Sequence, residues 1–213
     1  MVRVWHGVLV AWVVLAVGSA FAQGERRVLM VGQDVKPGER ITTGAGEQKA
    51  LLSPDGASLT VGPGSEIVLD KFQFDAATRT GEVALTVRQG SLRYGGGTIS
   101  KANEVVVAAG ASEVRIKGAT VAIGVQPMGV EVRLVVGERV TVSAAGASQS
   151  LSQPDGVIVV PAGKPPAVRT ASAPRPDDWA KQFHELDTMS RATRAVIDSS
   201  QNSRIAPPPT PGR

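Results

Sequence analysis

Few side chains in this sequence could carry out covalent or metal chemistry. The chain has no cysteine, so a thiol nucleophile and a disulfide framework are both excluded. Its two histidines are His6, in an apolar N-terminal stretch, and His184, in a C-terminal segment. A Ser-His-Asp triad would depend on His184 alone, and neighbouring Glu185 would not share its helix face, which disfavours a metal site. We therefore expect no catalytic residue, metal or cofactor, and interpret the protein as a non-enzyme.

Acidic and aromatic side chains around a predicted turn offer two further kinds of site. Asp70 and Asp75 could together hold calcium, which takes several oxygen ligands. Alternatively, Asp75 hydrogen-bonds the backbone of its own turn, and we favour this interpretation. Phe72 and Phe74 could stack on a saccharide, but two aromatics in the same phase of a half-buried strand are more typical of a core.

Two glycine-rich stretches could cradle a phosphate group. They are Gly62-Pro63-Gly64 and the triplet Gly95 to Gly97. A phosphate site of this kind is completed by the N-terminus of a helix, and neither stretch precedes a predicted helix. We interpret both stretches as turns.

The elements that position these residues form a hairpin from Ile67 to Tyr94. Val83, Leu85 and Val87 alternate with polar residues, which predicts a strand with one buried face. Before the turn at residues 75–81 the apolar phase changes near Asp70 and Lys71, which predicts a β-bulge.

From residue 26 to residue 168 the sequence repeats this pattern in short apolar-alternating runs. Gly, Pro, Asn and Asp separate the runs about every eight to twelve residues, which predicts an all-β domain. The last run, Val157 to Val160, is continuously apolar, as in a strand buried on both faces. Lys and Arg are interspersed with acids and the net charge is only +4, so a nucleic-acid binder is not expected.

Residues from Asp55 to Lys101 closely resemble the FecR domain. The matching residues are Asp55, Gly56, Leu59, Gly62, Pro63, Ser65, Phe72, Phe74, Asp75, Gly81, Leu85, Val87, Gly90 and Tyr94. A later family motif is present only in altered form, with Arg115 and Ala119 at positions where glycine and threonine are usual. The resemblance implies a twisted β-solenoid-like or jelly-roll fold of many short strands. It also implies a regulator. FecR regulators carry a cytoplasmic segment that regulates a sigma factor, and here only about seven residues precede the apolar stretch. Direct control of a sigma factor is therefore not expected unless a separate partner carries the signal.

The two ends of the chain differ from this β-domain. Residues 1–22 combine Arg3, an apolar run and an Ala-x-Ala site, which predicts a signal peptide cleaved between Ala22 and Gln23. The β-domain spans 25–168, followed by a Pro-rich linker at 169–176 and one amphipathic helix at 177–200. A Pro-rich tail at 201–213 completes the chain and is expected to be disordered. Trp179, Phe183 and Leu186 form the apolar stripe of the helix, which either docks on the β-domain or binds another protein.

Together these features predict a periplasmic or secreted bacterial protein that acts by contacting another envelope protein, in signalling or assembly. No stable membrane span is expected after cleavage; without cleavage the chain would be anchored in the inner membrane. A module that binds the cell wall or a polysaccharide is the alternative function.

Overall fold

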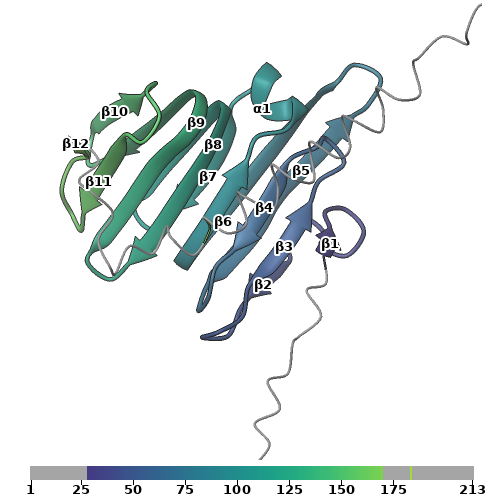
Figure 1. Ribbon diagram of the computed structural model, residues 1–213, viewed down its shortest axis with the longest axis horizontal. Helices are drawn as coiled ribbons and strands as arrows, with labels where there is room; N and C mark the ends of the chain where they lie inside the picture. The colour runs from purple at the N-terminus through teal and green to yellow at the C-terminus, as the bar shows by residue number, and fades with distance from the viewer. Residues whose placement is uncertain (1–27, 170–182, 184–213) are drawn as a thin grey trace, which may run out of the picture.

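The computed structural model describes residues 28–169 and residue 183, which form twelve strands and one short helix (Figure 1). The strands up to the helix α1 (Thr98–Ala102) are β1 (Val28–Met30), β2 (Arg40–Thr42), β3 (Lys49–Leu52), β4 (Ser58–Val61), β5 (Glu66–Asp75) and β6 (Thr80–Gly95). After α1 come β7 (Val105–Ala109), β8 (Ser112–Gln126), β9 (Gly129–Ala144), β10 (Ala147–Leu151), β11 (Val157–Pro161) and β12 (Ala167–Arg169).

Hydrogen bonds join the twelve strands into one open sheet that has two halves. In the first half the order is β2-β5-β6-β7-β8-β9-β10. In the second half the order is β1-β3-β4-β6-β8-β9-β11-β12. The long strands β6, β8 and β9 run through both halves. The all-β prediction is confirmed, and only β1–β3 and β6–β7 are parallel among the described strand pairs.

Glycines at positive φ mark the line along which the sheet passes from one half to the other. Gly90 in β6 has φ +84°, Gly118 in β8 has φ +52° and Gly137 in β9 has φ +126°. A Cβ atom on Gly90 would lie 2.2 Å from the Ser65 hydroxyl oxygen, so this bend excludes a side chain by contact as well as by backbone conformation.

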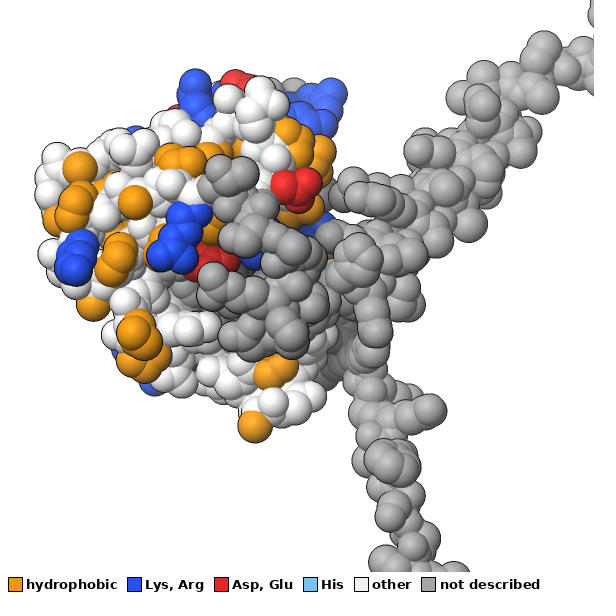
Figure 2. Space-filling view, turned by 60° about the vertical axis from the view of Figure 1, so that its left-hand side comes forward, with side chains coloured by type: hydrophobic (Ala, Val, Ile, Leu, Met, Phe, Trp, Pro, Cys, Tyr) orange, Lys and Arg blue, Asp and Glu red, His pale blue; other side chains and the backbone are white. Residues whose placement is uncertain are grey.

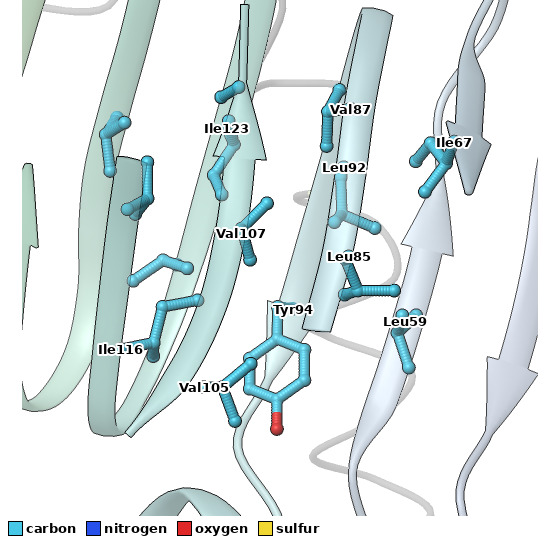
Figure 3. Close-up of a cluster of buried hydrophobic side chains, with 14 of the residues drawn as sticks. Leu59, Ile67, Leu85, Val87, Leu92, Tyr94, Val105, Val107, Ile116 and Ile123 are labelled. Carbon is cyan, nitrogen blue, oxygen red and sulfur yellow. The ribbon is translucent and has the colours of Figure 1, made fainter. Parts of the chain in front are cut away.

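The core lies between the two halves. Leu85 and Val87 from the first half of β6 are 1% and 0% exposed, and Leu92 and Tyr94 from its second half are both 0% exposed. Figure 3 shows these four side chains gathered in one cluster with their neighbours. The predicted phase of the hairpin is therefore confirmed, and each such side chain contributes roughly 1.5–3 kcal/mol by leaving water.

The β5–β6 hairpin contains the predicted bulge. The pairing register shifts between Leu69 and Lys71, which leaves Asp70 as the extra residue. Phe72 and Phe74, beyond the bulge, are partly buried and pack against the core, as the sequence indicated. The shift therefore lets both halves of β5 bury their apolar residues.

The helix α1 corrects one sequence-based expectation. The glycine triplet at 95–97 was predicted to be a plain turn with no helix after it, but α1 begins at Thr98. Its five residues are too few to produce a helical period that a sequence could reveal. The amphipathic helix predicted at 177–200 lies outside the described residues, except for Phe183. Within the described part of the chain, no helix is long and apolar enough to cross a membrane.

Candidate protein-binding surface

Asp55 connects the β3–β4 loop to α1. Its carboxylate accepts hydrogen bonds from the backbone N–H of Ala57 (3.1 Å) and of Ile99 (3.1 Å), and its backbone oxygen accepts one from the Thr98 N–H (2.9 Å). The residue is only 4% exposed. A carboxylate of the same chain thus already occupies the N-terminus of α1, so the glycine triplet does not form a phosphate cradle.

Tyr94 lies beside this carboxylate in the core. Burial raises the pKa of the Tyr94 phenol, and the negative charge of Asp55 raises it further, so the hydroxyl remains protonated at any physiological pH. The side chain is 0% exposed, and interactions of its hydroxyl with Ser100 and Gly97 oppose this rise only in part. A buried, neutral phenol in this position serves packing rather than proton transfer.

Ser65 joins the glycine-proline turn at 62–64 to the bend in β6. Its hydroxyl accepts a hydrogen bond from the Ser91 N–H (2.8 Å) and lies 3.2 Å from the Ser91 backbone oxygen, to which it can donate. Thr43 holds the same turn: its hydroxyl donates to the Gly62 oxygen (2.6 Å) and accepts from the Ser65 N–H (2.9 Å). The Gly-Pro-x-Ser motif therefore fixes the point where β6 changes from one half of the sheet to the other.

Asp70 and Asp75, the two acids that could hold calcium, both accept hydrogen bonds within the domain. Asp75 accepts hydrogen bonds from the N–H groups of Ala77 (2.8 Å) and Thr78 (3.3 Å), which confirms that it stabilises its own turn. These bonds, that of Thr78 foremost, hold the pKa of the Asp75 carboxyl below its usual range. Asp70 accepts a hydrogen bond from the Thr86 hydroxyl (2.7 Å). Among residues 28–169 and 183, no group of three potential metal ligands comes together.

The outer face of the first half of the sheet carries acidic and basic side chains that lie in pairs. Glu66 lies 3.3 Å from Arg40 and 3.6 Å from Arg88, and Glu104 lies 3.6 Å from both Arg115 and Arg139. Figure 2, in which the β10–β12 end of the molecule comes forward, shows basic, acidic and apolar side chains interspersed there, without a broad patch of one kind. Exposed pairs of this type contribute little to stability and are typical of a solvated face.

The outer face of the second half is different and was missed by the sequence reasoning. A cross-strand row runs from Arg93 in β6 through Ala122 in β8 and Arg133 in β9 to Val157 in β11. Ala122 is 2% exposed and Val157 is 5% exposed, although this face points away from the core. The one sequence signal for it was the uninterrupted apolar run that contains Val157. This row is the candidate surface for binding a protein segment, either the C-terminal segment of this chain or a partner.

Only one of the residues predicted to bind a partner lies in the described part of the chain. Phe183 is buried, with 2% of its surface exposed. Trp179, Leu186, His184 and the predicted cleavage site lie outside the described residues. The role predicted for Trp179, Phe183 and Leu186, docking on the β-domain or binding another protein, stays a prediction.

Comparison with known proteins gives a family for the central part of the chain. Residues 39–140 match the family model described as FecR protein. The search of curated proteins finds no match. Two crystal structures of a protein described as a "putative anti-sigma factor" from Parabacteroides distasonis ATCC 8503 share 17% and 15% sequence identity with the chain, at TM-scores of 0.48 and 0.49. Each match covers 63% of this chain and 61% of the other chain. From the family match and its motif residues, we identify residues 39–140 as a FecR domain.

Proposed function

We propose that this protein is a non-catalytic component of the bacterial cell envelope that acts through contacts with another envelope protein, in signalling or assembly. The FecR domain at residues 39–140 is the observation that carries the proposal. The polar motif residues Asp55 and Ser65 are buried and bond to the domain's own backbone. Because these residues serve the fold, a partner would be recognised by the outer faces of the sheet.

The sequence of the N-terminal segment supports the same proposal. The first 22 residues have the charge, apolar run and Ala-x-Ala site of a cleaved signal peptide. N-terminal sequencing of the protein recovered from a bacterial host should therefore begin at Gln23. Recovery of the uncleaved chain in the inner-membrane fraction would contradict export and favour the anchored form.

A pulldown tests whether the protein works through a partner. The tagged chain is purified from an envelope extract and compared with the same chain carrying Thr86→Arg, a change on the outer face of the first half of the sheet, or Leu52→Arg, a change at an exposed residue on the outer face of the second half. We expect one envelope protein to co-purify in a fixed ratio and one of the two substitutions to remove it. Recovery of the chain alone from every extract would count against a protein partner.

A further inference from the structure

Three apolar residues of the described chain are buried outside the core. Ala122, Val157 and Phe183 are 2%, 5% and 2% exposed, but none of them belongs to the cluster between the two halves of the sheet. Ala122 and Val157 lie in one cross-strand row, each paired with Arg133 of β9. Two of the three therefore share one patch on the outer face of the second half.

The arginines of this row cannot account for the burial by themselves. Arg93 and Arg133 flank Ala122, and their methylene stems could cover its methyl group. An arginine that lies across an exposed sheet keeps its guanidinium group in water. Here the Nε atoms of both arginines are also buried, which indicates that further atoms lie over the row.

The sequence of β11 independently indicates that both of its faces are covered. Val157 to Val160 is continuously apolar, whereas the neighbouring strand β9 alternates. Ile158 and Val160 face the core, and Val157 faces the arginine row. A strand exposed on its outer face would carry a polar residue at position 157.

We propose that the C-terminal segment of residues 177–187 docks on this row, with Phe183 over Ala122 and Val157. The continuous described stretch ends at Arg169, which pairs with Val157 at the edge of the same row. From β12 to β8 is three strand spacings, roughly 14 Å, and the thirteen residues from 170 to 182 can span up to about 43 Å when extended.

Charge also favours this occupant. The segment from Asp177 to Asp187 carries four acids and one lysine, and these acids lie on both sides of Phe183 in the sequence. The row has two arginines, one on either side of Ala122, and Arg133 also lies 3.5 Å from Glu131. An aromatic ring between guanidinium groups, with carboxylates beside them, satisfies both the apolar and the charged parts of the surface. The docking rests on contacts within one chain and does not depend on the proposed envelope partner.

Limited proteolysis of the purified full-length chain tests the docking. Chymotrypsin cuts after aromatic residues, and the rate of cutting after Phe183 is measured by mass spectrometry against a synthetic peptide of residues 175–191. We expect the chain to be cut at least about tenfold more slowly than the peptide, because proteolysis follows the population of the open form. Ala122→Arg should restore fast cutting, whereas Ala108→Arg, at an exposed site in β7 on the other half, should not.

A second pair of variants keeps the test decisive if Ala122→Arg does not fold. Combining Arg93→Glu with Arg133→Glu should repel the acidic segment and speed cutting after Phe183 by a similar factor. Arg115→Glu, at an exposed site in β8, should leave the rate unchanged. The proposal is overturned if the wild-type chain is cut as fast as the peptide. It is also overturned if no substitution in the row changes the rate of cutting after Phe183. Protection that disappears on dilution would also overturn it, because a second copy would then be the cover.

Discussion

Replacing Asp55 by alanine should destabilise the domain strongly, because its buried carboxylate holds two backbone N–H groups. The substitution leaves the Ala57 and Ile99 N–H groups buried without an acceptor. Each such group costs about 1–3 kcal/mol, and allowing for relaxation of the loop we expect a total loss of about 3 kcal/mol. In urea, with an m-value of about 2 kcal/mol per molar, the unfolding midpoint should fall by about 1.5 M.

Asp75→Ala is the matched control, because Asp75 also accepts two backbone N–H bonds in a turn. Asp75 is exposed, so water replaces its carboxylate and the midpoint should stay within about 0.3 M of the wild-type value. Both midpoints are read from circular dichroism at 218 nm, a wavelength typical of β-structure. Equal shifts for the two variants would refute the reasoning, because burial is the difference between them.

Three further predictions follow from the core, the bend and the turn. Leu85→Ala should lower the free energy of unfolding, measured in urea, by about 2–5 kcal/mol, whereas Arg88→Ala should lower it by at most about 0.5–1 kcal/mol. Similar losses for the two variants would mean that the hairpin faces are wrongly assigned. Gly90→Ala should lower the thermal midpoint by several degrees, whereas Gly46→Ala, whose new methyl group meets nothing within 4 Å, should change it little. The lowered pKa of Asp75 stabilises the fold above the unfolded-state pKa, and this contribution disappears as the pH falls through the folded-state value. The wild-type advantage over Asp75→Asn should therefore be present at pH 7 and shrink below about pH 4, and an advantage independent of pH would contradict this.

Alternation was sufficient to predict the central hairpin from the sequence. Alternate residues of a strand point to opposite faces of the sheet, so the order of apolar and polar residues shows which face is buried. The burial of Leu85 and Val87 and the bulge at Asp70 follow from this order. The bend at Gly90 was not predictable in the same way. A glycine in a strand is compatible with a bulge, a bend or a close contact, and the contact with Ser65 is 25 residues away in the sequence.

The burial of the row on the outer face could not be predicted from the sequence either, except at Val157. Ala122 lies between two core residues of β8, and nothing in the sequence distinguishes it from any other small residue of a strand. Its burial depends on long-range pairing that sets Arg93 and Arg133 on either side of it. The helix α1 was missed because its start is fixed by Asp55, which lies more than forty residues earlier in the sequence.

Crosslinking in intact cells tests the central claim, that the protein acts through contacts with an envelope partner. The native bacterium is treated with a short amine-reactive crosslinker, its peptidoglycan is digested, and complexes that contain the chain are separated by size and identified by mass. The proposal predicts one discrete complex that contains a second envelope protein and persists after digestion. A chain recovered only as a monomer, or one released from the cell wall by digestion without any attached protein, would contradict it.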